Sequence, residues 1–418
     1  MIYDVCVIGG GAAGIASAKN SYEEGLKIRL IERNNELGGI LNQCIHSGFG
    51  IHHYKEELTG PEYAERIQNE LTLDIEVSLN TSVVRLIKEN NLFHLTLSSE
   101  QEGIQMIKSK SVIISTGSYE RTRSQINLPG KRLKGIFSAG SAQRYMNQLG
   151  YMVGKKVVIL GSGDIGLIMA RRMTLEGAKV EAVVELMAHS NGLTRNIVSC
   201  LEDFDIPLYL SHTISDIYGD KSLKAVEVSK VDEHLRPIEA DRFLIECDTL
   251  LLSVGLIPEI SLLDEIKPKK DTKTRSVIVN QTYQTSIDGL FVCGNSLQIH
   301  DLVDFVSKEG TIAGRSAKKY VLKKELHQKE EIEIDIDDHL TYVVPQTIDL
   351  NDLNEDFEIS FRVKEKHEEI LIHVFQGELK IKDKRIKFAI PSEMEKITIE
   401  KEALKSKQAI KMTLEVIK

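Results

Sequence analysis

The stretch Val5-Cys6-Val7-Ile8-Gly9-Gly10-Gly11-Ala12-Ala13-Gly14 decides the fold of this chain. Its apolar half predicts a buried strand, and its glycine-rich half leads into residues 12–24, which have helical character. Residues 27–32 then predict a second strand. The first glycine permits a tight turn, the second lets a pyrophosphate approach the backbone, and the third allows helix and strand to pack closely. The stretch therefore predicts a βαβ unit with a phosphate-binding turn.

Two further features of this unit suit a dinucleotide. A helix N-terminus presents N–H groups and a partial positive charge to phosphates. Glu32 lies 23 residues after Gly9, where a carboxylate can accept hydrogen bonds from a ribose 2′-hydroxyl. Taken alone, the motif is a weak indication, because glycine-rich turns between strands and helices are common.

A second copy of the pattern makes the indication strong. Residues 157–160 form another apolar run, which leads into Gly161-Ser162-Gly163-Asp164-Ile165-Gly166, a helical stretch to Glu176 and a strand that ends at Glu185. The two turns are 152 residues apart, and at this offset each helix ends at a glycine, Gly25 or Gly177. Two matched copies predict two dinucleotide sites.

The composition argues against several other classes of protein. With 418 residues, 42% of them hydrophobic and 28% charged, the chain is long enough for two or three globular domains. Its net charge of −9 argues against a nucleic-acid partner, and no apolar run approaches the ~20 residues of a membrane span. The first residues enter a strand directly, so we expect no signal peptide. The five cysteines are scattered, without a CxxC or a metal-like cluster, which is typical of a cytoplasmic protein without disulfides.

The second nucleotide-binding pattern lies inside the first. Residues 82–108 alternate as a small antiparallel meander, and residues 111–115 form a short buried strand that leads into Thr116-Gly117. Residues 250–255 repeat this strand-then-glycine pattern after the second βαβ unit. We therefore expect the second domain to be inserted, with its entry near Gly117 and its exit near Gly255.

The remaining sequence predicts a return to the first domain and then a third domain. Residues 289–295 form a strand that ends at a turn, and a helix of roughly 20 residues follows, from near Leu302 to Lys323. Segments after residue 356 alternate at period two, which indicates an antiparallel sandwich or partial barrel. The expected fold class is α/β, with two Rossmann-like three-layer dinucleotide-binding domains, one inserted in the other, and a C-terminal all-β domain. The expected boundaries are 1–117 and 256–330 for the first domain, 118–255 for the second, 331–340 for a charged linker and 341–418 for the β domain.

The loop after the first unit is where we expect the chemistry. Residues 40–54 have neither helical nor strand periodicity and contain Cys44, His46, His52 and His53. Histidine can transfer a proton near neutral pH, and His46 is the first choice because it follows Cys44 most closely. Cys44 is either a reactive thiol with a lowered pKa or a small packed residue, and we favour the packed residue.

The assembled motifs resemble those of the flavoproteins with two dinucleotide-binding domains, of which thioredoxin reductase is the compact relative. The resemblance rests on the two glycine-rich turns, on Ser115-Thr116-Gly117 and on the return 288–295, and it covers about residues 1–330. Residues 38–46, Cys293-Gly294-Asn295 and residues 300–304 are similar to a branch of this pyridine nucleotide-disulfide oxidoreductase superfamily without a redox dithiol. That branch includes flavoproteins associated with glycerol-3-phosphate dehydrogenase, subunits of sarcosine, opine and proline oxidising complexes, and hydrogen cyanide synthase.

The resemblance implies FAD on the first domain and a nicotinamide cofactor on the second. For FAD it implies contacts from Gly9, Gly11, Ala12, Ala13, Gly14, Glu32, Arg33, Gly39, Val83, Thr116, Gly117, Gly294, Asn295, Leu302 and Val303. For the nicotinamide cofactor it implies Gly161, Gly163, Asp164, Ile165, Gly166, Glu185 and Gly255. One position departs from the superfamily, which has Gly-Asp where this chain has Gly294-Asn295. The amide can still accept and donate hydrogen bonds, but a negative charge near the flavin is absent.

NAD(H) is a better fit than NADP(H) for the second site. Glu185 occupies the ribose-binding position, where a carboxylate repels a 2′-phosphate, and residues 186–189 supply no arginine to offset it. The alternative is a vestigial second site that keeps the fold and binds nothing.

These observations predict a cytoplasmic FAD-dependent oxidoreductase that exchanges hydride between NAD(H) and FAD. Because no dithiol follows the first turn, we expect electrons to pass to or from another group. The resemblance implies that this is a partner subunit or a small substrate of the amino acid, amine or glycerol-phosphate type. We also expect a second redox subunit or a homo-oligomer, with the C-terminal β domain as a docking module. One alternative is a single-cysteine NADH-dependent disulfide or peroxide reductase that uses Cys44. Another is a non-catalytic flavoprotein that serves as an assembly or sensor subunit.

Overall fold

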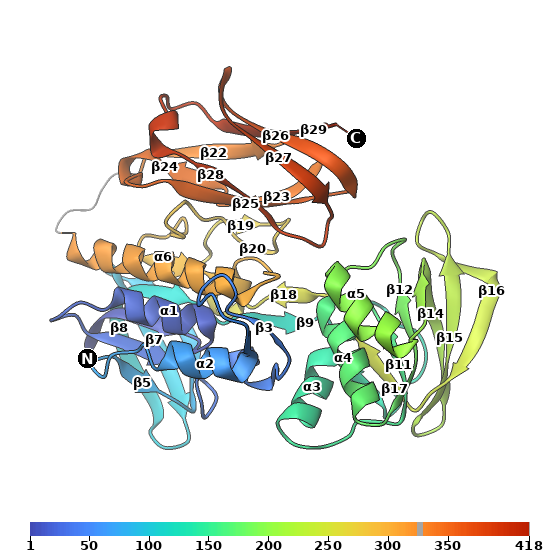
Figure 1. Cartoon of the computed structure of the whole chain (residues 1–418). Helices are drawn as coiled ribbons and strands as arrows, with labels where there is room; N and C mark the ends of the chain where they lie inside the picture. The colour runs from blue at the N-terminus through green and yellow to red at the C-terminus, as the bar shows by residue number, and fades with distance from the viewer. Residues whose placement is uncertain (324–328, 418) are drawn as a thin grey trace. The chain divides into compact units, whose positions relative to one another are not determined.

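The computed structural model describes residues 1–323 and 329–417, which divide into two compact units (Figure 1). The first unit comprises Met1–Asn42, Ser47–Ser118 and Pro258–Lys418, and the second comprises Gln43–His46 and Tyr119–Ile257. Most of the second unit is therefore inserted in the sequence of the first.

A mixed sheet forms the centre of the first unit, with strand order β5-β2-β1-β8-β7-β6 and with β21 beside β8. Its strands are β1 (Ile2–Ile8), β2 (Ile28–Ile31), β5 (Glu76–Ser78), β6 (Thr81–Glu89), β7 (Leu92–Ser99), β8 (Gly103–Ile114) and β21 (Leu290–Val292). β8 is antiparallel to β7 in its first half and parallel to β1 and β21 at its carboxyl end. Because the strand order proceeds from β1 toward β2 on one side and β8 on the other, a switch point for ligand binding lies at these carboxyl ends.

Helices α1 (Ala12–Ser21), α2 (Gly60–Gln68) and α6 (Val303–Leu322) belong to the same unit. α1 and α6 pack with their backbones in contact. A Cβ at Gly310 would lie 2.2 Å from the carbonyl oxygen of Ala13, and one at Gly314 would lie 2.4 Å from that of Ser17. The predicted helix from near Leu302 to Lys323 is thus present as α6, held against the helix that follows the first glycine-rich turn.

The second unit repeats the same layering. Its parallel sheet has the order β10-β17-β11-β12-β13, and a three-stranded meander β14-β15-β16 lies beside it. These elements are β10 (Ile136–Ser138), β17 (Thr249–Leu252), β11 (Lys156–Leu160), β12 (Lys179–Glu185), β13 (Leu208–Leu210), β14 (His212–Gly219), β15 (Leu223–Val231) and β16 (Pro237–Glu246), with helices α3 (Ala139–Asn147), α4 (Asp164–Leu175) and α5 (Thr194–Cys200). Val157 and Ile159 of β11 belong to the core under the helices, whereas Val158 and Leu160 belong to the core under the meander. Both faces of the sheet are therefore covered, as expected for a parallel sheet.

Residues 331–417 form a sandwich of two sheets, called the β domain below, with orders β24-β22-β29-β26-β27 and β23-β25-β28. Its strands are β22 (Glu331–Ile336), β23 (Leu340–Val344), β24 (Thr347–Asp349), β25 (Phe357–Val363), β26 (His367–Gln376), β27 (Leu379–Ala389), β28 (Glu395–Ile399) and β29 (Ile410–Val416). Apolar residues of both sheets form one core. The expectation of a linker over 331–340 is wrong, because Ile332 and Ile334 alternate with acids and are buried as the inner face of β22. The last residues predicted for the first domain fall partly on 324–328, outside the described residues.

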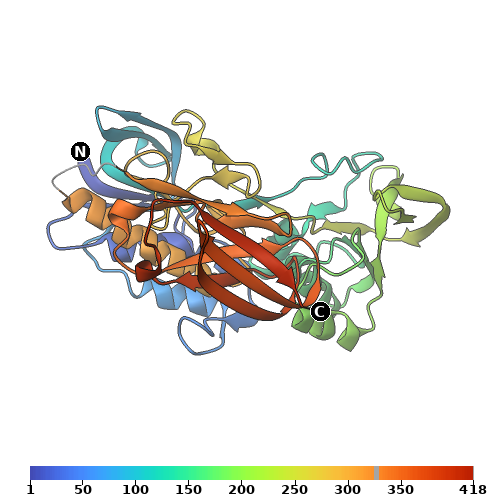
Figure 2. The ribbon, with the colours of Figure 1, turned by 90° about the horizontal axis from the view of Figure 1, so that it is seen from above.

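The β domain shares its core with the rest of the first unit. Tyr342 and Val344 of β23 are buried in the same apolar cluster as the residues of β1 and β8, and in both views the β domain lies against α6 (Figures 1 and 2). Short strand pairs complete the fold, namely β3 (Ser47–Phe49) with β4 (Leu58–Thr59), β9 (Ser118–Glu120) with β18 (Leu256–Pro258), and β19 (Lys270–Asp271) with β20 (Ser276–Val277). The predicted α/β class with two Rossmann-like halves and a strand-rich C-terminal region is confirmed. No described helix is long and apolar enough to cross a membrane.

Candidate active site

The first turn, Gly9–Gly14, follows β1 at the switch point of the sheet. Its outer glycines are required by packing. A Cβ at Gly9 would lie 2.4 Å from the carbonyl oxygen of Ser115, and one at Gly14 would lie 1.8 Å from the carbonyl oxygen of Gly9 itself. Gly9 also has φ +105°, which favours glycine. The turn is therefore held against β8, from which Ser115 extends.

Open space lies in front of the middle of this turn. Apart from its chain neighbours, a Cβ at Gly11 or at Gly117 would have no described atom within 4 Å. α1 begins directly after Gly11, and no side chain of the described residues caps its N-terminus. A helix N-terminus with accessible N–H groups attracts an anion. These features of the first turn fit the pyrophosphate of FAD.

Glu32, the predicted ribose-binding acid, also stabilises the turn. Its side chain is buried, and its two oxygens accept hydrogen bonds from the backbone N–H of Gly10 at 2.6 Å and of Asn34 at 2.8 Å. Each carboxylate oxygen has a further lone pair for a ribose hydroxyl. β6 begins beside this residue, because the N–H of Thr81 donates to the carbonyl of Glu32 at 2.9 Å, and Val83 follows two residues later.

The return turn, Gly294–Ser296, lies next to the first turn. A Cβ at Gly294 would come within 2.9 Å of the Cβ of Ala13, in the first turn of α1. Asn295, which replaces the usual aspartate, accepts a hydrogen bond at its Oδ1 from the N–H of His300 at 3.1 Å. The amide NH₂ of Asn295 is then the group left to donate to a ligand.

The other residues predicted to bind FAD differ in how closely they approach the first turn. A Cβ at Gly39 would lie 3.2 Å from the Cα of Gly11, so Gly39 borders the turn. The hydroxyl of Thr116 donates to the carbonyl of Glu259 at 2.6 Å, so this side chain is engaged within the protein. Leu302 is the N-cap residue of α6 and Val303 its first residue. Arg33 is exposed.

Asp304 is a residue of this region that the sequence interpretation missed. Its buried carboxylate accepts hydrogen bonds from the N–H groups of Gly50, His52 and His53, at 3.3, 3.0 and 2.6 Å. The ring of His52 stacks on Phe305, with centroids 5.5 Å apart. The histidine-rich loop is therefore tied to the first turn of α6. An acid in a helix's first turn was the available signal, although it normally indicates only a favourable helix dipole.

The second turn, Gly161–Gly166, has the same construction in the second unit. A Cβ at Gly161 would lie 2.0 Å from the carbonyl oxygen of Ser253, whereas one at Gly163 would meet only the hydroxyl of Ser253, at 3.7 Å. Buried Glu185 accepts hydrogen bonds from the N–H and hydroxyl of Ser162, at 2.9 and 2.6 Å, and from the N–H of Met187. It thus holds the second turn as Glu32 holds the first.

The other residues predicted to bind the nicotinamide cofactor differ in how they are engaged within the protein. The Oδ1 of Asp164 accepts hydrogen bonds from the N–H of Leu193 and the amide of Asn196, so it stabilises the start of α5. Ile165 is half-buried in α4. A Cβ at Gly255 would lie 3.5 Å from the Cδ of Arg121, a residue that the sequence interpretation missed. The Nε of Arg121 is buried without a hydrogen-bond partner in the described part of the chain.

Cys44 lies in a different environment from the one a nucleophile needs. Its segment, Gln43–His46, belongs to the second unit, where Gln43 donates to the carbonyl of Gly140 and to the side chain of Gln143. The Cys44 thiol lies 3.8 Å from the Oε1 of Gln143, and burial raises its pKa to about 12. A thiol with this pKa is protonated at neutral pH and is a poor nucleophile. All five cysteines are free thiols.

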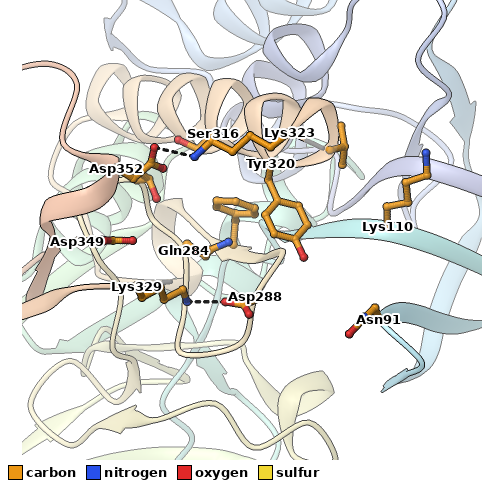
Figure 3. A pocket seen from close by; sticks show the side chains of 13 residues that line it. Asn91, Lys110, Gln284, Asp288, Ser316, Tyr320, Lys323, Lys329, Asp349 and Asp352 are labelled. Atoms are coloured by element: carbon orange, nitrogen blue, oxygen red, sulfur yellow. Dashed lines mark hydrogen bonds and ion pairs between the residues drawn. The ribbon is translucent and has the colours of Figure 1, made fainter. Parts of the chain in front are cut away.

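A cavity of about 250 Å³ in the first unit is separate from these turns (Figure 3). Four of its charged side chains pair with each other. Lys329 lies 3.0 Å from Asp288, and Lys323 lies 3.1 Å from Asp352. Asp288 precedes β21, whereas the return turn follows it, so the cavity borders the opposite end of that strand.

Two Rossmann-like halves with matched phosphate-binding turns define an oxidoreductase of the class that combines a flavin with a nicotinamide nucleotide. Residues 3–339 match the model of the pyridine nucleotide-disulphide oxidoreductase family, and the chain belongs to this family. The family is one of FAD- and NAD(P)-binding oxidoreductases.

The sequence identity to individual relatives is low. The chain is 26% identical over 312 residues to sarcosine oxidase subunit alpha of a Corynebacterium species, a match that covers 70% of this chain and 31% of that subunit. It is 27% identical over 316 residues to ferredoxin–NADP reductase 1 of Bacillus mycoides, covering 72% of this chain and 83% of that protein. The crystal structure of thioredoxin reductase from T. acidophilum superposes with a TM-score of 0.64 at 21% identity, covering 77% of this chain and 99% of that one, and this likeness concerns the fold.

Proposed function

We propose that this protein exchanges hydride between NAD(H) and FAD and passes the electrons to or from a partner subunit or a small substrate. The substrate would be of the amino acid, amine or glycerol-phosphate type. FAD, when bound, supplies the redox chemistry. The chain's own residues would bind the two nucleotides, orient them and exclude water.

The matched construction of the two turns supports this proposal best. Each combines glycines that pack against a strand, a helix N-terminus without a side-chain cap, and a buried glutamate that accepts from the turn's backbone. The first site would use Gly9, Gly11, Ala12, Ala13, Gly14, Glu32, Arg33, Gly39, Val83, Thr116, Gly117, Gly294, Asn295, Leu302 and Val303 for FAD. The second would use Gly161, Gly163, Asp164, Ile165, Gly166, Glu185 and Gly255 for NAD(H).

Glu185 favours NAD(H) over NADP(H). Its carboxylate is fixed by three donors at the end of β12, so it remains where a 2′-phosphate would approach. Residues 186–189, Leu-Met-Ala-His, offer no arginine to compensate the repulsion.

A partner or small substrate, rather than a disulfide, is favoured by the state of Cys44. The pKa of the Cys44 thiol is raised, and residues 39–54 contain no second cysteine. Neither observation supports dithiol exchange. The similarity to a sarcosine oxidase subunit supports operation within a multi-subunit assembly. His46 remains the proposed proton carrier of the loop.

Anaerobic titration of the purified yellow protein tests the central step. NADH should bleach the visible flavin absorbance with a stoichiometry of one, and NADPH should do so at least tenfold more slowly. A flavin that dithionite reduces but NADH does not would contradict the proposal and favour the non-catalytic subunit. Co-purification from the native cell would then show whether a second redox subunit is present.

Cys44→Ser separates the proposal from a single-cysteine reductase. Because the thiol is half-buried and protonated, we expect the variant to keep NADH-dependent reduction of an artificial acceptor within about twofold of wild type. A loss of more than a hundredfold, with normal FAD content, would favour the reductase. Cys200→Ser, which replaces a second thiol of the same unit, is the control.

A further inference from the structure

A buried carboxyl group lies behind the return turn. Glu309, in the first half of α6, is 3% exposed, and its carboxylate accepts hydrogen bonds from the N–H of Gly294 at 2.8 Å and from the amide of Gln298 at 2.7 Å. A buried carboxylate is unfavourable unless cations or several donors compensate it. An uncharged residue could fill this position, so the acid requires an explanation.

The polar groups around Glu309 are incompletely paired. The Nε2 of His300 lies 3.0 Å from the Oε1 of Glu309 without forming a hydrogen bond, and the Oε1 of Gln298 has no partner among the described residues. The titratable groups that face this carboxyl come from five segments of the unit: Cys293 after β21, Tyr283 before it, His300, Tyr342 on β23 and Lys396 on β28. Of these described groups, Lys396 is the cation.

Lys396 reaches α6 from the β domain. Its Nζ lies 3.4 Å from the centroid of the Phe305 ring, one helical turn before Glu309 on the same face of α6. Burial lowers the pKa of Lys396, and the carboxylates of Glu358 and Glu309 oppose that shift. The ammonium is therefore held on α6 by the ring of Phe305, and the negative charges of Glu358 and Glu309 attract it.

An ion pair fixes the sheet that carries Lys396. Arg362 on β25 donates to the carboxylate of Asp301 and, at 3.1 Å, to the carbonyl of Ile299, both in the loop between the return turn and α6. The N–H of Met394, just before β28, donates to the other oxygen of Asp301 at 2.6 Å. β25 and β28 are paired strands, so the position of Lys396 is coupled to the return-turn loop from two sides.

We propose that the buried carboxyl group of Glu309, together with the ammonium group of Lys396 that the β domain places one helical turn away on α6, sets the electrostatic field of the return turn toward bound FAD. The inference rests on the proposed function, because FAD is the group that this turn would hold. Glu309 and Lys396 act as positioning residues, through the N–H of Gly294. The β domain thereby becomes part of the flavin site rather than a docking module alone.

The pair predicts a pH-dependent flavin potential. Burial raises the pKa of Glu309 to about 7, against the opposing effects of Gln298, Gly294 and Lys396. Below this pH the carboxyl is neutral, and above it the new negative charge disfavours the further negative charge of a reduced flavin. The midpoint potential should therefore fall by an additional step near neutral pH. Removal of Lys396 should move that step to higher pH, because the carboxylate loses its cation.

The test measures the flavin midpoint potential of the purified holoenzyme against reference dyes, with an enzymatic reductant that does not involve NADH. Glu309→Gln should abolish the additional step near neutral pH, and Lys396→Met should displace that step to higher pH. At pH values above the step, the flavin midpoint potential of Glu309→Gln should be higher than that of wild type. The expected difference is a tenfold or greater change in the redox equilibrium, which is about 30 mV for a two-electron couple. Lys396→Arg should restore the wild-type curve.

Lys382→Met is the control, because Lys382 is a cation of the same domain whose partner is Glu400. If Glu309→Gln or Lys396→Met has the wild-type pH curve, the inference is overturned. Should Lys396→Met fail to retain FAD, Glu309→Gln, which preserves the size of the side chain, still decides it. A protein whose flavin is not reduced by NADH but whose potential follows this pattern would refute the proposed function and leave the inference standing.

Discussion

At Gly14 an added Cβ would lie 1.8 Å from the carbonyl oxygen of Gly9, whereas at Gly11 it would enter space that the described chain leaves open. The two glycines of one motif therefore serve different purposes. Gly14 allows α1 to pack under the turn, and Gly11 leaves room for a ligand. The spacing of the motif predicts both roles, and the structure distinguishes them by what each side chain would meet.

Gly11→Ala and Gly14→Ala should therefore affect different properties, FAD binding in the first case and stability in the second. Gly11 has an ordinary φ of −78°, so the free energy of unfolding of its alanine variant should lie within about 0.5 kcal/mol of wild type. The same variant should bind FAD at least tenfold more weakly. Gly14→Ala should destabilise the fold by about 1–3 kcal/mol through overpacking. Denaturant unfolding of the apoprotein and recovery of FAD fluorescence would measure the two quantities. Equal FAD affinity in Gly11→Ala and wild type would contradict the assignment.

Individual residues of the site are also where sequence interpretation fails. Glu309 and Asp304 are acids on an amphipathic helix, a pattern that normally indicates a solvated face, yet both are buried. Their hydrogen-bond partners, Gly294 and the loop 50–53, are distant in sequence or lack periodicity. Cys44 is recognisable as a candidate, but its pKa depends on burial that no motif encodes.

Among the elements, α6 determines how the histidine-rich loop is held. Asp304 is the acceptor for three backbone N–H groups of that loop, those of Gly50, His52 and His53, and Phe305 stacks on His52. The helix was predictable from its apolar spacing and from the glycine turn before it. β22 was not, because its acidic residues resemble a solvated linker until the alternation of Ile332 and Ile334 is considered.

Asp304→Asn should release this loop without unfolding the protein. An amide offers one acceptor oxygen in place of two, so at least one buried N–H loses its partner, at a cost of about 1–3 kcal/mol. Hydrogen exchange of the amides of residues 50–53 should accelerate by roughly tenfold or more, since 1.4 kcal/mol is a factor of ten. Asp264→Asn, at an exposed acid of the same unit, is the control. Unchanged exchange in Asp304→Asn would show that other contacts hold the loop.

For the molecule as a whole, the β domain and the rest of the first unit share one apolar core. Tyr342 and Val344 of the β domain belong to the core beneath the first turn, and Arg362 pairs with Asp301. The sequence indicates three domains by changes of periodicity, but it contains no sign that the third shares a core with the first. Such packing depends on which few side chains of an edge strand face inward.

A cavity in the β domain should therefore weaken FAD retention. Phe361→Ala removes a fully buried ring from β25 and should destabilise the β domain by about 3–5 kcal/mol. The temperature at which FAD fluorescence appears on heating should fall by several degrees. Met173→Ala, a comparable cavity in the second unit, should leave that temperature within about one degree of wild type. An equal fall of the FAD-release temperature in both variants would contradict a core shared by the β domain and the rest of the first unit.

Glu32 and Glu185 have a consequence for the kinetics of nucleotide exchange. Each carboxylate accepts a hydrogen bond from the backbone of its own turn, so we expect both turns to keep this shape when a nucleotide binds. Binding then loses little conformational entropy of the loop, and its rate is governed by diffusion and desolvation rather than by folding of the turn. Differences in cofactor affinity between variants of these turns should consequently reside in the rate of departure.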